Sequence, residues 1–292
     1  MNYQSDRRTF LTASTLASIG AITGCGGNVV SEDMTASDED PFYISLIGAQ
    51  LYTVRDLFEV DPQATLAALA EIGIRDCETA GLFDHSAADV RAMMDDLGLV
   101  SRSGHVRLPW LRDDATFAST LEDASTLGQD RLYLGWIPEE ERAPDKYKAL
   151  AELLNKRGEE AKAAGMMVGY HNHEFEFVEQ DGVTGYGILL EETDAELVTM
   201  ELDLYWIAHA GLDAGTVFDR SPGRFSAVHI KDRTASGEMA SVGDGLVDFK
   251  ALLPQAQYAG VNRFYIEHDN PEDPIASIGR SHSYIMAEIP HR

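Results

Sequence analysis

The sequence predicts an α/β protein whose single folded domain, residues 43–292, is a closed (β/α)8 barrel. Short runs rich in apolar and β-branched residues alternate with longer segments of helical apolar spacing, which favours a parallel sheet covered by helices. Eight such runs occur within 292 residues, and eight strand–helix repeats favour a closed barrel over an open sheet. The length suits one barrel-sized domain better than two small domains.

The boundaries of the elements carry residues typical of their type. The predicted strands are 44–50, 74–78, 99–105, 132–136, 167–171, 198–203, 227–231 and 264–267. The predicted helices are 64–72, 87–97, 117–127, 144–164, 213–218, 249–258 and 275–289. Good capping residues or first-turn prolines open four of them: Asp61-Pro62, Ser86, Asp113 or Asp114, and Pro144. Glycine often follows a helix, as at Gly73 and Gly128.

Polar side chains stand at or near the end of nearly every predicted strand. They are Gln50, Glu78, His105, Trp136, His171, Asp203, His229 and Glu267. In a barrel the C-terminal strand ends open at one mouth, so side chains far apart in the sequence converge there. A polar residue at one or two strand ends is ordinary. A titratable or amide group at seven of eight ends predicts a functional site.

Three of these residues, Asp203, His229 and Glu267, end consecutive strands, and His171 ends the strand before them. Mixed oxygen and nitrogen donors suit a divalent ion such as Mn, Co, Zn, Fe or Mg. A lone buried histidine usually belongs to the core, and a strand-end aspartate often caps the next helix. Four such residues on adjacent strands favour a metal site.

Several motifs together carry a family resemblance. They are QLYTVRD at 50–56, GYHNH at 169–173 with EF at 176–177, ELD at 201–203 with YW at 205–206, VHIKD at 228–232 and IEHD at 266–269. From about Ile44 to Asp269 the chain resembles the sugar phosphate isomerase/epimerase family, the xylose-isomerase-like TIM barrels. The resemblance implies an ion held by Glu, Asp, His and Glu from strands five to eight. Here His171 replaces the first glutamate and Glu176 lies five residues on, so the fourth ligand is open between them.

The resemblance implies a metal-dependent isomerase or epimerase acting through an enediolate on an unphosphorylated sugar, keto-sugar or cyclitol. The ion acidifies a carbon beside a carbonyl, so an ordinary carboxylate can remove its proton. Loss of the family glutamate at His171 makes elimination at least as attractive, so a keto-glycoside lyase or dehydratase of the same fold is the first alternative. A non-catalytic, lipid-anchored sugar-binding barrel is the second.

The catalytic roles are assigned to four residues. We expect Glu176 or Glu267 to be the base and His173 or Lys231 to be the acid. Lys231 shares a strand face with His229, because side chains alternate along a strand, and an ion pair with Glu201 or Asp203 is its competing interpretation. The expected substrate contacts at the mouth are Arg55, Glu78, His105, Trp136 and Trp206, with Tyr52 as a further flat face.

The charge balance restricts the partners. The formal net charge is −26, from 49 acidic and 23 basic residues, and such a surface repels nucleic acid. This argues against the related endonuclease IV type of barrel, which needs a basic face. The expected partner is a small carbohydrate, and the only expected contact with a membrane is an N-terminal lipid anchor.

The first 25 residues resemble a twin-arginine export signal that ends in a lipobox. Arg7-Arg8 precede Phe10-Leu11 and a short apolar run, which is followed by the lipobox-like 22–25. The resemblance implies export and lipidation at Cys25, with residues 26–42 as a flexible tether rich in Gly, Ser, Asp and Glu. The expected location is the periplasm or the cell surface.

Overall fold

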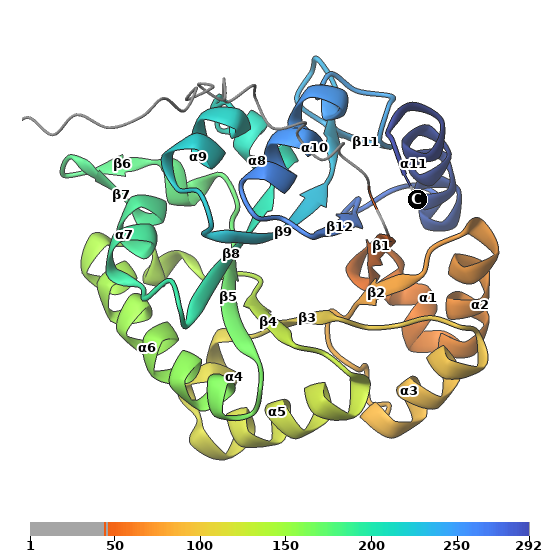
Figure 1. Cartoon of the computed structure of the whole chain (residues 1–292), viewed down its shortest axis with the longest axis horizontal. Coiled ribbons are helices and arrows are strands. Elements are labelled where there is room, and N and C mark those ends of the chain that lie inside the picture. Colours follow the sequence, from red (N-terminus) through yellow and green to blue (C-terminus); the bar gives the residue numbers. More distant parts are fainter. Residues whose placement is uncertain (1–43, 45, 292) are drawn as a thin grey trace, which may run out of the picture. The chain divides into compact units, whose positions relative to one another are not determined.

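The computed structural model describes residues 44 and 46–291, which form a (β/α)8 barrel. Eight parallel strands hydrogen-bond in the order β2-β1-β12-β9-β8-β5-β4-β3, and the isolated bridges Asp76–Val100 and Thr79–Gly104 join the two ends of this series. Figure 1 shows the helices as a ring outside the strands. The strands are β1 (Ile47–Gln50), β2 (Asp76–Glu78), β3 (Ser103–Val106), β4 (Arg131–Leu134), β5 (Met167–His171), β8 (Val198–Asp203), β9 (Phe225–Ile230) and β12 (Arg263–Ile266).

The predicted fold class is confirmed, and β5 and β8 have the predicted bounds. The largest differences lie at strand starts. The first strand begins at Ile47 and not at Ile44, which pairs only through an isolated bridge with His291. The third strand begins at Ser103 and not at Leu99. Before Ser103 the chain pairs with β2 through one isolated bridge, between Val100 and Asp76, and forms no continuous ladder.

The predicted helices are also present, with small shifts at their ends. They are α2 (Pro62–Ile72), α3 (Ala87–Asp96), α5 (Asp114–Leu127), α6 (Pro144–Ala163), α9 (Ala214–Arg220), α10 (Phe249–Tyr258) and α11 (Pro274–Glu288). The side chains of Asp61, Ser86 and Asp113 each accept a hydrogen bond from the backbone N–H three residues on, as N-caps do. Gly73 ends α2 in the left-handed region at φ 111°.

Short elements in the connections after the strands were not predicted, because a helix of one or two turns is too short for its apolar spacing to be recognised. They are η1 (Leu51–Val54), α1 (Arg55–Val60), α4 (Leu108–Arg112), η2 (Glu139–Glu141), η3 (Phe175–Phe177), α7 (Gly185–Glu192) and α8 (Leu204–His209), with the two-stranded ribbons β6 (Glu179–Gln180)–β7 (Val183–Thr184) and β10 (Asp232–Arg233)–β11 (Met239–Ala240). Several of them form the walls of the barrel mouth.

Two tyrosines fill the barrel interior beside the strand-end histidines. Tyr133 and Tyr265 are fully buried, and an added Cβ would lie 2.4 Å from Tyr133 at Gly169 and 2.3 Å from Tyr265 at Gly48. Only glycine therefore leaves room for these rings at both positions. The Tyr265 ring centroid is 6.4 Å from that of His229, so the tyrosine adjoins the site.

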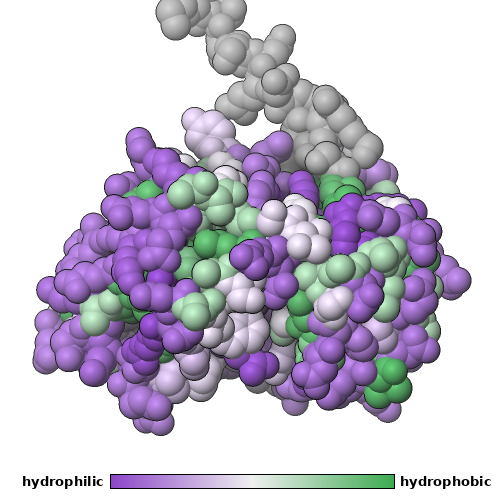
Figure 2. Space-filling model, turned by 90° about the horizontal axis from the view of Figure 1, so that it is seen from below, coloured by the Kyte–Doolittle hydropathy of each residue, from purple (hydrophilic) through white to green (hydrophobic). Residues whose placement is uncertain are grey.

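The face in Figure 2 is mostly hydrophilic, with apolar residues in small separate patches, as the acidic composition suggests. Within the described part of the chain, no helix is long and apolar enough to cross a membrane. The export signal predicted at 1–25, the lipidation predicted at Cys25 and the tether predicted at 26–42 all fall outside the described residues.

Candidate metal centre

The four residues predicted to hold a metal come together at the C-terminal mouth of the barrel. His171 ends β5, Asp203 ends β8, His229 lies on β9 and Glu267 directly follows β12. One potential ligand atom from each lies within 4.8 Å of the others, and all four side chains are buried. The convergence follows from parallel strands in register, with Asp203 paired to His229.

Unpaired buried atoms in this group fit a cation. Both ring nitrogens of His171 make no hydrogen bond among the described residues, and Asp203 Oδ2, which lies 3.4 Å from His171 Nε2, already faces a cation in the Lys231 ammonium 3.0 Å away. Burial lowers the pKa of His171, so its ring is neutral and offers a lone pair at pH 7. Burial would raise the pKa of Asp203, but the Lys231 ammonium beside it lowers that pKa to about 2. These two donors are therefore in the form that binds a divalent ion.

His229 is held at both ring nitrogens. Its Nδ1 is 2.7 Å from Glu267 Oε2, and its Nε2 is 2.7 Å from Glu78 Oε2 and 3.2 Å from Glu201 Oε2. Burial would lower the pKa of His229, but the charges of Glu201 and Glu267 raise it well above the ordinary value. A metal-bound histidine usually donates its other N–H to a carboxylate. Glu78 and Glu201 provide that acceptor behind His229.

A second group overlaps the first and contains His105, His171, Glu201 and His229. Glu201 was not among the predicted site residues. Oε2 of Glu201 is 2.7 Å from His105 Nε2, and the His105 and His229 rings stack at 7°. The period of two along β8 could have identified Glu201, because it shares a strand face with Asp203.

Lys231 places a buried ammonium among three carboxylates. Its Nζ is 3.0 Å from Asp203 Oδ2, 2.8 Å from Glu267 Oε2 and 2.7 Å from Asp269 Oδ1. Burial would lower the pKa of Lys231, but these carboxylates raise it well above the ordinary value. The ion pair predicted with Asp203 is confirmed. Glu201 pairs with histidines instead, and the partner Asp269 was not predicted.

Glu176 lies outside both groups. Its Oε1 accepts a hydrogen bond from the Tyr170 hydroxyl at 2.7 Å, and its Oε2 accepts one from the His173 backbone N–H at 2.8 Å. The structure thus gathers His171, and not Glu176, with the other three predicted ligands. Burial raises the pKa of Glu176 to about 8.

This raised pKa leads to a prediction about stability. Between about pH 4.5 and 8 the unfolded chain ionises at Glu176 while the folded protein stays protonated, so the free energy of unfolding falls as pH rises, by up to about 5 kcal/mol. We expect Glu176→Gln to lose this decline. Melting temperatures of both proteins across pH 5–8.5 check it, and parallel curves would contradict it.

A cavity of about 820 Å³ opens beside the metal group. At its inner end lie His171, His173, Lys231, Glu267 and Asp269. Burial lowers the pKa of His173 well below the ordinary value, so its imidazole is neutral, and its Nδ1 makes no hydrogen bond among residues 46–291. The cavity is of a size that holds small-molecule ligands.

Two of the five predicted substrate contacts, His105 and Trp136, line this cavity together with the further predicted face Tyr52, and the other three lie elsewhere. Glu78 is fully buried, and its carboxylate accepts hydrogen bonds from Gln50 and Ser103. Arg55 donates to the backbone oxygen of Asp269 at 2.7 Å and so holds the segment after β12. The Trp206 ring packs against His173, with centroids 5.2 Å apart. The position of these residues at strand ends correctly placed them near the barrel mouth. It did not predict how deeply each side chain is buried.

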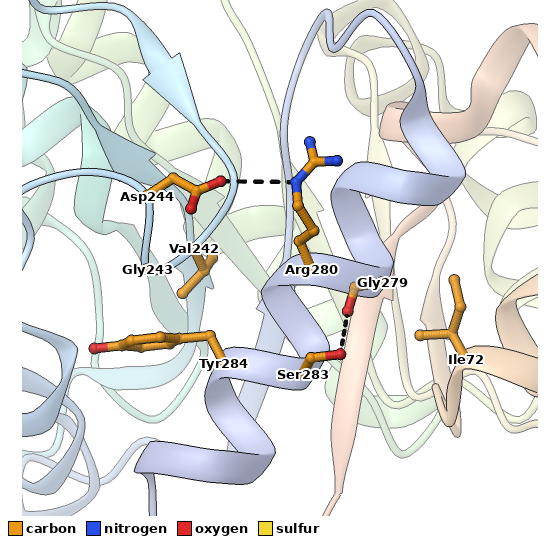
Figure 3. A pocket seen from close by; sticks show the side chains of 8 residues that line it. All are labelled: Ile72, Val242, Gly243, Asp244, Gly279, Arg280, Ser283 and Tyr284. Atoms are coloured by element: carbon orange, nitrogen blue, oxygen red, sulfur yellow. Dashed lines mark hydrogen bonds and ion pairs between the residues drawn. The ribbon is translucent and has the colours of Figure 1, made fainter.

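Another pocket, of about 550 Å³, lies between α11 and the segment 242–244 (Figure 3). Its residue Arg280 is paired with Asp244 across the pocket, with Nε and Oδ2 3.6 Å apart. Gly243 has φ 94°, and an added Cβ would lie 2.3 Å from the Tyr284 ring. Neither metal-ligand group includes a residue of this pocket, so the chemistry is assigned to the barrel mouth.

Residues 66–286 match the family described as "Xylose isomerase-like TIM barrel". The chain belongs to the xylose isomerase-like TIM barrel family. This xylose isomerase-like barrel is similar to a solved sugar phosphate isomerase/epimerase from Parabacteroides distasonis, with a TM-score of 0.74 and 24% identity over 85% of this chain and 98% of that one. At this identity the likeness shows the fold.

Curated relatives of this xylose isomerase-like barrel include inosose dehydratases. The one from Lacticaseibacillus casei is 26% identical over 140 residues, which cover 42% of this chain and 46% of the relative. The one from Clostridium perfringens is 28% identical over 151 residues, which cover 44% and 49%. The matched stretches thus span about half the length of these relatives.

Proposed function

We propose that this protein is a divalent-metal-dependent enzyme that acts through an enediolate on an unphosphorylated keto-sugar or cyclitol, and that elimination is its outcome. The observation that supports this most is the buried group of His171, Asp203, His229 and Glu267 beside the Lys231 ammonium at one cavity. When bound, the ion would supply Lewis-acid stabilisation of negative charge on the ketone oxygen.

Elimination suits the groups that reach the cavity. Epimerisation by two bases needs a proton acceptor on each face of the sugar carbon, but Glu176 is enclosed and His171 stands where the family has its first glutamate. The similarity to dehydratases supports the same choice. One base and one acid are sufficient for elimination.

The proposed step conserves oxidation state. A cavity group with a free lone pair, Glu267 or His173, removes the proton from the carbon next to the ketone. The electron pair of that C–H bond forms the C=C bond, and the C–O bond at the β carbon breaks. Lys231 donates a proton to the departing oxygen, so the products are an unsaturated ketone and water or an alcohol.

Proton NMR in deuterated water tests this function. With Mn²⁺ added to the full chain and a set of inososes and 3-keto-glucosides, we expect one substrate to lose the signal of the proton beside the ketone and to gain a vinyl signal. A new diastereomer without loss of water or alcohol would replace elimination with epimerisation. If neither exchange nor product appeared with any compound, while Glu267→Gln bound sugar as well as the parent protein, the chain would be a binding protein.

A further inference from the structure

The cavity extends well beyond the metal group. Its outer wall is formed by the connection after β3, with Pro109 and Arg112, and by the connection after β4, with Trp136 and Glu141. At about 820 Å³ it lies toward the upper end of the roughly 300–1,000 Å³ typical of sites for drug-sized ligands. A single sugar ring at the metal group fills only part of this volume.

Trp136 offers a flat apolar face at this outer end. Its side chain is 52% exposed, two residues past the end of β4. The Arg142 guanidinium lies 5.7 Å from the Trp136 ring centroid and 3.5 Å from that of Phe175, and it is bonded to the Ile137 oxygen. The ring is thus supported by Arg142, while about half of the residue stays exposed where it lines the cavity. An exposed aromatic face is the surface against which the C–H face of a sugar packs.

Polar groups suited to hydroxyls lie on the same wall. Arg112 Nη2 and Glu141 Oε2 are 2.7 Å apart and join α4 to η2. Their hydrogen bond raises the pKa of Arg112 and lowers that of Glu141, so both are charged at pH 7. The pair leaves further guanidinium N–H donors and carboxylate lone pairs for neighbouring hydroxyls. Because the opposite charges of Arg112 and Glu141 cancel, this wall suits a neutral ligand that carries several hydroxyl groups.

We propose that the outer half of this cavity is a subsite for a second sugar ring, so that the substrate is a keto-disaccharide or a similar glycoside. This rests on the proposed function. The ring at the metal group carries the ketone, and the ring against Trp136 is the alcohol that leaves when the β C–O bond breaks.

Paired substrates isolate this subsite. We would compare 3-keto-glucosides whose aglycone is a methyl group or a second glucose ring, in α and β forms, so that the chemistry is the same and only the outer ring differs. For one of the two anomers, we expect kcat/KM to be about tenfold higher with the disaccharide than with the methyl glycoside, which corresponds to about 1.4 kcal/mol. Trp136→Ala should remove this preference through KM, while Trp136→Phe keeps most of it.

Trp110→Ala is the matched control, because Trp110 lines a neighbouring pocket and not this cavity. Calorimetric binding of the same pairs gives a second measurement that does not depend on turnover. Equal binding of methyl glycoside and disaccharide, or an equal loss of both in Trp136→Ala, would overturn the subsite. Preferential binding of the disaccharide without any turnover would overturn the proposed function and leave the subsite standing.

Discussion

Asp203→Asn will yield a folded protein with less than about one tenth of the parent's divalent-metal content and turnover lower by roughly a thousandfold. The two carboxylate oxygens of Asp203 have separate tasks. Oδ1 accepts the Trp206 backbone N–H at 2.9 Å and caps α8, whereas Oδ2 faces the metal group and the Lys231 ammonium, which is 3.0 Å away. Asparagine caps a helix about as well as aspartate, so the substitution removes charge and metal affinity while keeping the cap.

Asp76→Asn is the control for the metal experiment. Asp76 is as buried as Asp203, but it binds Arg102 and the Tyr265 hydroxyl and belongs to neither metal-ligand group. We expect this variant to lose stability and to keep the metal. Metal content by mass spectrometry and turnover on the same preparations decide the question. Normal metal content and turnover in Asp203→Asn would refute the metal centre.

Much of this site was predictable because a parallel barrel converts a repeat along the chain into proximity in space. His171, Asp203, His229 and Glu267 recur at intervals of one strand–helix unit, and each strand exposes its end at the same mouth. The inward direction of Lys231, which directly follows β9, was inferred from the side-chain period of two that it shares with His229. These inferences need only the order of the elements and the direction of the strands.

The depth of each side chain could not be predicted in this way. Glu78 stands at a strand end like the others, yet it is enclosed because His229, 151 residues away, covers it. Glu176 accepts hydrogen bonds from the Tyr170 hydroxyl and from the His173 backbone N–H, and both contacts depend on the path of η3. Arg55 reaches Asp269 across 214 residues. Such contacts depend on the positions of several elements at once, and no local pattern encodes them.

Lys231→Met will lower turnover by about 10²–10⁴-fold and will destabilise the metal-free protein by about 3–5 kcal/mol. The loss of turnover follows from the missing proton donor at the cavity wall. The loss of stability follows because Asp203 and Glu267, both buried, then lack the ammonium that lies 3.0 Å and 2.8 Å from their oxygens.

Added metal should restore much of this stability, since a divalent ion held by Asp203 and Glu267 supplies the missing positive charge. The rise in melting temperature on adding Mn²⁺ after chelator treatment should therefore be larger for Lys231→Met than for the parent protein. Lys231→Arg keeps a positive charge that does not release its proton, so it separates the two roles: turnover falls while the metal-free protein loses less stability than Lys231→Met. If Lys231→Met kept full turnover, Lys231 would be a structural counter-ion only, and the departing oxygen would have to receive the proton that the base, Glu267 or His173, had removed from the carbon.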